Sequence, residues 1–147
     1  MIFVDTSFWI AASMPRDTRH AEARDLLMRH GDSSLLTSNL VRGETWTLLR
    51  RRSGHRAAVG FLNRIDRSPR LRVAFVGEAL EEEALRWLRR RDEREYSFVD
   101  ATSFALMRSL QHPAGARLRR RLRRSRVHRA ESLRASRPSP SMASCPS

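Results

Sequence analysis

Short apolar runs alternate with longer segments of helical periodicity along the first 110 residues of the chain. The runs at residues 1–4, 34–38 and 71–76 have the length and composition of buried strands, so we expect three strands there. The segments around them carry apolar residues at helical spacing, and several of them end at a glycine or a proline. They predict helices over residues 6–14, 17–31, 39–54, 55–69, 78–92 and 97–110.

Strands that alternate with helices favour an α/β domain in which helices cover both faces of a short parallel sheet. We therefore expect a three-layer α/β/α sandwich. In sheets of this kind, ligands bind beyond the carboxyl ends of the strands. Asp5 stands at such an end, directly after the first predicted strand, which makes it a candidate binding residue. The alternative is that Asp5 only caps the helix that follows it.

Charge divides the chain into two parts. All 29 basic residues are arginine; residues 1–110 hold 19 of them with 15 acids, a formal +4, and residues 111–147 hold 10 with one acid, a formal +9. A basic surface favours phosphate-rich partners, although a genome rich in G and C would explain the arginines of the first part equally well. Residues 111–147 have no aromatic residue and end in serine and proline, so we expect a disordered tail after a domain over residues 1–110.

Several classes of protein are excluded by composition. There is no apolar stretch of 18 residues, so we expect no membrane span. The N-terminus lacks a basic region before its apolar run, so a signal peptide is not expected. A single cysteine, Cys145, cannot form an internal disulfide or a cysteine cluster for zinc. The expected location is cytoplasmic.

Two further acidic residues interrupt apolar stripes of predicted helices. Glu44 has a leucine four residues before it and another four residues after it, so we expect it to point inward. Asp100 shares its stripe with Phe104 and Met107. A buried carboxylate without a partner costs several kcal/mol, so each of these acids requires one.

Each acid has a structural explanation of its own. Asp5 would cap a helix, Glu44 would pair with a buried arginine such as Arg42, and Asp100 would form a capping box with Ser97. One functional explanation covers all three acids. Carboxylates that converge repel by roughly 4 kcal/mol per pair at about 4 Å and an effective dielectric constant near 20, and a divalent cation such as Mg²⁺ or Mn²⁺ removes that repulsion.

Three motifs resemble those of one enzyme family. The segments MIFVDTS, SNLVRGETW and YSFVDATSFALM, in this order and at this spacing, are similar to motifs of the PIN-domain ribonucleases, and the compact length resembles their VapC-type toxins. The resemblance covers residues 1–110. It implies a PIN-like α/β/α fold and the toxic component of a type II toxin–antitoxin system, an endoribonuclease that hydrolyses RNA phosphodiester bonds.

The resemblance also implies a site and partners. Asp5, Glu44 and Asp100 would be the catalytic residues. Asp5 and Asp100 would be ligands of Mg²⁺, with Mn²⁺ as the alternative ion, and Glu44 would be a further ligand or a residue that supports the ligands. Thr6 and Ser7 would be neighbours of the site. The implied partners are an RNA substrate and a cognate antitoxin protein that blocks the site, and a homodimer is allowed.

The C-terminus departs from the family pattern. The family usually has a fourth acidic region there, but this chain has RLRRRLRR, and Glu131 is the one acid beyond Asp100. Arginine and leucine codons read one base later permit Ala-Phe-Asp-Gly-Asp-Phe-Ala at this place, with the acids about 19 and 21 residues past Asp100. We therefore hypothesise that a one-base shift near codon 110 replaced the native C-terminus. The alternative to this hypothesis is a purposeful basic tail. The alternative to an active ribonuclease is a catalytically impaired remnant that binds antitoxin or nucleic acid without cleavage.

Overall fold

The computed structural model describes residues 1–91 and 94–111, and at its centre lies a sheet of three parallel strands. The strands are β1 (Ile2–Phe3), β2 (Leu35–Ser38) and β3 (Leu71–Ala74), in the order β1-β2-β3. Ile2 is paired with Leu35, and Leu35 is in turn paired with Leu71. The predicted short parallel sheet is confirmed.

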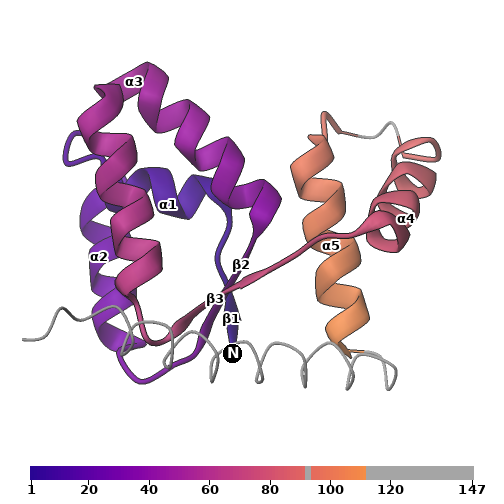
Figure 1. Ribbon diagram of the computed structural model, residues 1–147, viewed down its shortest axis with the longest axis horizontal. Helices are drawn as coiled ribbons and strands as arrows, with labels where there is room; N and C mark the ends of the chain where they lie inside the picture. Colours follow the sequence, from indigo (N-terminus) through magenta and orange to yellow (C-terminus); the bar gives the residue numbers. More distant parts are fainter. Residues whose placement is uncertain (92–93, 112–147) are drawn as a thin grey trace, which may run out of the picture.

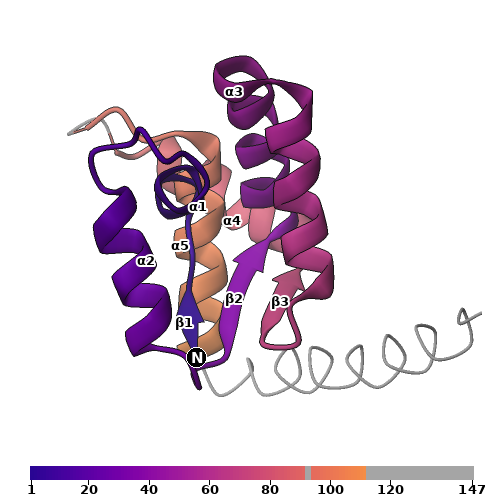
Figure 2. The same ribbon diagram turned by 90° about the vertical axis from the view of Figure 1, so that its left-hand side faces the viewer.

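Helices cover both faces of this sheet. Figure 1 shows α1, α2 and α3 on one side of the strands and α4 with α5 on the other, and Figure 2 gives the same arrangement in a perpendicular view. The predicted α/β/α sandwich is therefore confirmed. The helices are α1 (Thr6–Ser13), α2 (His20–Arg29), α3 (Asn39–Arg67), α4 (Glu78–Leu88) and α5 (Phe98–Gln111).

The two apolar layers meet at β2, whose successive side chains point to opposite faces. Leu35 belongs to the cluster that the sheet forms with α1 and α3, where Trp9 and Phe61 lie edge to face with ring centroids 5.7 Å apart. Leu36 belongs to the cluster on the other face, where it packs with Leu106 of α5. A strand buried on both faces is what a parallel sheet between two helical layers requires.

A glycine divides α3 into two helical halves. Gly54 has φ +84°, in the left-handed region that residues with a Cβ rarely adopt, and the helix doubles back at this point (Figure 1). The sequence predicted two helices that meet at Gly54, which is confirmed. The second half returns beside α1, where Nη2 of Arg64 donates to Oγ of Ser13 at 2.6 Å.

Some predicted elements are shorter than expected because side chains take over backbone hydrogen bonds. The strand over residues 71–76 ends at Ala74, since the N–H of Val76 donates to Oδ1 of Asn39 at 2.7 Å. The helix over residues 17–31 begins only at His20, because Oδ1 of Asp17 accepts from the N–H of Arg19 at 2.9 Å.

The expectations about the C-terminal part of the chain concern residues that the structure does not describe. The predicted tail over residues 111–147, with the missing acidic region and the hypothesised frame shift, lies outside the described residues except for Gln111, the last residue of α5. These expectations stay predictions, as does the domain boundary at residue 110. Among the helices that the structure describes, none combines the length and the apolar content that a membrane crossing requires.

Phe61 offers a direct test of the larger core. Its side chain is fully buried, so Phe61→Ala is expected to lower the free energy of unfolding by about 3–5 kcal/mol through the lost apolar burial and the cavity left behind. Phe75, which is 76% exposed, is the matched control, and Phe75→Ala should change stability by less than about 0.5 kcal/mol. Urea unfolding of both variants measures the difference, and equal midpoints would contradict this description of the core.

Candidate active site

A cavity of about 610 Å³ opens beside the carboxyl end of β1, and acidic residues from three parts of the fold line it. Asp5 follows β1, Glu44 lies in the first half of α3, and Asp100 lies in the first turn of α5. These are the three acids that the sequence singled out. Their elements come together only in the folded chain, at the edge of a parallel sheet where ligands bind in such folds.

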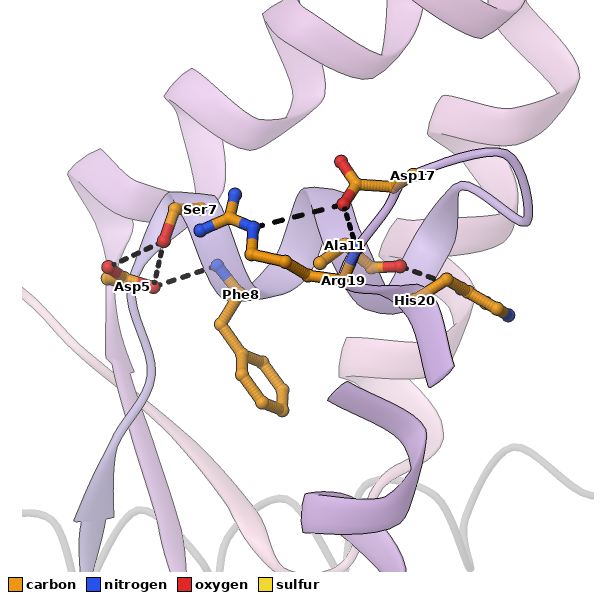
Figure 3. A network of polar contacts seen from close by, with 7 residues as sticks. All are labelled: Asp5, Ser7, Phe8, Ala11, Asp17, Arg19 and His20. Carbon is orange, nitrogen blue, oxygen red and sulfur yellow. Dashed lines mark hydrogen bonds and ion pairs between the residues drawn. The ribbon is translucent and has the colours of Figure 1, made fainter. Parts of the chain in front are cut away.

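Asp5 caps α1 and is itself oriented by a hydroxyl group (Figure 3). Its Oδ1 accepts from the N–H of Phe8 at 2.9 Å, and Oγ of Ser7 donates to both carboxylate oxygens at 3.2 and 3.0 Å. The expected capping role is therefore present. A carboxylate offers about four acceptor positions, so the cap leaves acceptor capacity on this exposed side chain.

Asp100 forms a reciprocal capping box with Ser97 at the start of α5. Its backbone N–H donates to Oγ of Ser97 at 3.0 Å, and its Oδ2 accepts from the N–H of Ser97 at 3.0 Å and from the hydroxyl at 2.9 Å. Ser97 also lines the cavity. The box fixes the carboxylate at the cavity wall while the side chain stays exposed.

Glu44 is half-buried and is held from α1. The hydroxyl of Thr6 donates a hydrogen bond to its Oε2, which ties the first turn of α1 to α3. The sequence offered a buried arginine as the partner of Glu44, and the structure supplies the Thr6 hydroxyl in its place. Thr6 and Ser7 both line the cavity, so they are neighbours of the three acids as expected.

The expectation that the acids occupy core-facing positions is wrong. Asp5 and Asp100 are exposed, and Glu44 is only half-buried. The apolar stripe that carries Asp100, Phe104 and Met107 exists, but it forms a wall of the cavity. The buried face of α5 instead carries small residues such as Ala101 and Ala105, which pack against α4.

Three charged residues that the sequence did not place at the site also line the cavity. Asp17 and Arg19 come from the turn before α2, and Nε of Arg19 lies 3.9 Å from Oδ1 of Asp17. In Figure 3 the Arg19 side chain extends toward the start of α1, where Asp5 and Ser7 lie. Arg52 is the last of three consecutive exposed arginines of α3, which begin at Arg50.

The charges of the lining add up to an acidic pocket with a basic component. Four carboxylates and two guanidinium groups give it a formal charge of −4 + 2 = −2. The acids attract a cation, and the two arginines attract an anionic group such as a phosphate. A ligand that combines a divalent cation with a phosphate complements both.

The donor chemistry of the pocket suits a hard cation. Carboxylate oxygens are the ligands that Mg²⁺ and Mn²⁺ prefer. Within residues 1–91 and 94–111, no group of three or more histidine, cysteine, aspartate or glutamate side chains is arranged to hold a metal ion. Mg²⁺ retains several waters and is usually held by one or two carboxylates together with substrate phosphates, so the chemistry of the Asp5 and Asp100 side chains, which line one cavity, suits this ion.

Comparisons with known proteins find a matching family, a similar toxin and a similar solved structure. Residues 2–114 match the family described as the PIN domain. The chain is 57% identical over 108 residues to the 23S rRNA-specific endonuclease VapC20 from two strains of Mycobacterium tuberculosis, and the match covers 74% of this chain and 81% of that protein. A crystal structure of M. tuberculosis VapC20, titled a sarcin–ricin loop cleaving toxin, superposes with a TM-score of 0.68 and 55% identity over 74% of this chain and 82% of that chain.

Proposed function

Because this chain belongs to the PIN-domain family, we propose that it is an endoribonuclease of the VapC type, the toxic component of a type II toxin–antitoxin system. One observation carries the proposal: Asp5, Glu44 and Asp100, from three separate elements, line a single pocket at the carboxyl end of β1. The proposal includes Mg²⁺, or Mn²⁺ in its place, as cofactor. It also includes a cytoplasmic location and a cognate antitoxin that blocks the pocket.

In this proposal each acid has a defined task. Asp5 and Asp100 bind the cation, and their cap hydrogen bonds with Phe8, Ser7 and Ser97 hold the carboxylates in place before the ion arrives. Glu44, held by Thr6, adds negative charge behind them. When bound, the ion would supply charge that stabilises the phosphodiester transition state and would activate the attacking water.

The arginines of the pocket act on the substrate. Arg19 and Arg52 line the same cavity as the acids, so they attract the RNA backbone toward the carboxylates. Asp17 lies 3.9 Å from the guanidinium of Arg19 and limits where that group can move. A guanidinium group presents several donors in a fixed plane, which suits the oxygens of a phosphate.

The substrate class follows from the relatives. VapC20 is described as a 23S rRNA-specific endonuclease and a sarcin–ricin loop cleaving toxin, and the PIN-domain match over residues 2–114 spans the elements that carry all three acids. We propose that this chain likewise cleaves a structured loop of ribosomal RNA. An open cavity of about 610 Å³ has room for a phosphate and a neighbouring nucleotide.

Metal removal tests the proposed function. The full chain is incubated with a synthetic RNA hairpin of the 23S sarcin–ricin loop and, separately, with an unstructured RNA of the same composition. We expect cleavage of the hairpin in Mg²⁺, loss of cleavage after treatment with EDTA, and recovery when Mg²⁺ or Mn²⁺ is returned. Cleavage that persists in EDTA would contradict a metal site. Binding of the hairpin without any cleavage would favour a non-catalytic remnant.

A further inference from the structure

Three aromatic residues form a cluster beside the acidic pocket. Trp87 of α4 contacts Tyr96, with ring centroids 4.7 Å apart, and contacts Phe104 of α5 at 5.5 Å, while Tyr96 and Phe104 are 6.0 Å apart. The interplanar angles of 63° to 82° are those of edge-to-face pairs, which aromatic rings prefer. Phe104 is therefore packed against two other rings on one side.

The other side of Phe104 is open. Its side chain remains 38% exposed, although α5 buries the residues on either side of it, and it lines the cavity of the three acids. Phe75 and Phe98 are also exposed, but neither lines this cavity, so the position of the Phe104 ring in the pocket of the acids is what calls for an explanation. We propose that Phe104 is a stacking platform for a nucleobase of the RNA substrate, an inference that rests on the proposed function.

The position of Phe104 along α5 supports this role. Phe104 lies one helical turn after Asp100, on the same face, and residues at this spacing are neighbours on a helix surface. A base is joined to its phosphate through one sugar. A phosphate held near Asp100 therefore leaves a flanking base within reach of Phe104.

Two apolar residues of the cavity lining suit the face of a base. Met107, on the next turn of α5, and Leu48, from α3, line the same cavity and are apolar. Stacking on an aromatic side chain tolerates any base, because every base has a π face, whereas reading of a base edge requires hydrogen-bonding groups. Phe104 is thus inferred to position the nucleotide, and recognition of the sequence or shape of the loop belongs to other contacts.

The chain contains a matched control for this inference. Phe98 lies on the same helix and has the same 38% exposure, but it does not line the cavity. Loss of either ring removes a similar amount of exposed apolar surface from α5. Only the loss of Phe104 removes a surface that lines the cavity of the acids.

The test compares Phe104→Ala, Phe104→Leu, Phe104→Trp and Phe98→Ala in the full chain. Each protein is titrated, with Ca²⁺ in place of Mg²⁺, into hairpin RNA that carries 2-aminopurine next to the mapped cleavage position, and cleavage is then measured in Mg²⁺. We expect quenching of the probe by the parent, by Phe104→Trp and by Phe98→Ala, but not by Phe104→Ala or Phe104→Leu. The two latter variants should raise KM about tenfold or more.

An RNA with an abasic nucleotide at the stacked position separates stacking from packing. The parent should have the same raised KM on this RNA as Phe104→Ala has on the intact RNA. The KM of Phe104→Ala should be the same on both RNAs, because the two changes remove one interaction. Circular dichroism and thermal unfolding report whether each variant is folded. Full activity and full quenching of Phe104→Leu would show that the ring serves packing alone and would overturn the inference.

The outcomes also separate this inference from the proposed function. A parent chain that cleaves the hairpin, together with a Phe104→Ala variant that matches Phe98→Ala in KM and quenching, overturns the stacking role and leaves the ribonuclease assignment intact. A parent chain that neither binds nor cleaves RNA overturns both.

Discussion

Replacement of either Asp5 or Asp100 by asparagine is expected to reduce Mg²⁺-dependent RNA cleavage at least about 100-fold. Each change removes a formal negative charge from the pocket, and a metal contributes several kcal/mol to the transition state, of which each 1.36 kcal/mol corresponds to a factor of about ten in rate. Initial cleavage rates at saturating Mg²⁺ measure the effect. They are compared in the present chain and in a version that carries the shifted-frame sequence in place of residues 111–147.

Asparagine is the informative substitution because it preserves the caps. Asparagine is as good an N-cap as aspartate, so Asp5→Asn keeps an acceptor for the N–H of Phe8. Asp100→Asn likewise keeps an oxygen for the N–H of Ser97. Thermal unfolding of both variants should stay close to that of the parent. If both variants cleave at the parent rate, the two carboxylates serve only as caps and the metal-site assignment is wrong.

An acid outside the pocket gives the matched control. Asp25 lies on α2, is half-exposed and pairs with Arg29 at 2.8 Å, and it does not line the cavity. Asp25→Asn makes the same change in net charge, and an exposed pair of this kind is worth only about 0.3–0.5 kcal/mol to stability. Its cleavage rate should equal that of the parent. A loss comparable to that of Asp5→Asn would point to a general charge effect.

Replacement of residues 111–147 by the sequence read in the shifted frame is expected to stabilise the protein and to raise its cleavage rate. The shifted frame permits two aspartates and several large apolar residues where the chain now carries arginines. Each large apolar side chain contributes about 1.5–3 kcal/mol when buried, so the free energy of unfolding should increase by at least about 3 kcal/mol. Urea unfolding and Mg²⁺-dependent cleavage measure the two effects.

The described part of the chain offers a place where an added strand could pack. β1 lies at the end of the sheet order and pairs with β2. A second cavity, of about 190 Å³, runs beside it and is lined mostly by apolar residues of β1, α1 and α2, among them Phe3, Phe8 and Leu27. An extended apolar segment would extend the sheet here and fill this cavity, which supports the frame-shift hypothesis without testing it.

A third version of the protein separates the new strand from the loss of arginines. It carries an uncharged tail of glycine and serine in place of residues 111–147. This version should match the chain as written in stability, because neither tail supplies large apolar side chains in a strand pattern. If the chain with its own residues 111–147 is as stable and as active as the shifted-frame version, the basic tail is functional and the frame-shift hypothesis is wrong.

Most of the fold could be predicted from local patterns in the sequence. Apolar runs set the three strands, and a glycine within a long helical segment marked the break in α3. The first four residues predict a strand, and Asp5 caps the helix that begins at Thr6. The carboxyl end of β1 could therefore be placed as well. These features depend on neighbours in the chain, which is why sequence alone carries them.

The environment of the acids could not be predicted in the same way. A stripe such as Asp100, Phe104 and Met107 shows that three residues share a helix face, but periodicity does not say whether that face meets the core or a cavity. The contribution of Arg19 was missed for a related reason. The turn before α2 is brought to Asp5 by the chain reversal between α1 and α2, and no local signal marks that meeting.

The central claim is that Asp5, Glu44 and Asp100 form one metal-dependent site, and the location of a bound ion tests it most directly. Crystals of the full chain are soaked in Mn²⁺, which gives an anomalous signal, at a concentration that supports RNA cleavage. We predict an anomalous peak in the 610 Å³ cavity, bonded to a carboxylate oxygen of Asp5 and of Asp100, that is lost in Asp5→Asn. A peak elsewhere, or an empty cavity in a protein that cleaves RNA under the same conditions, would contradict the claim.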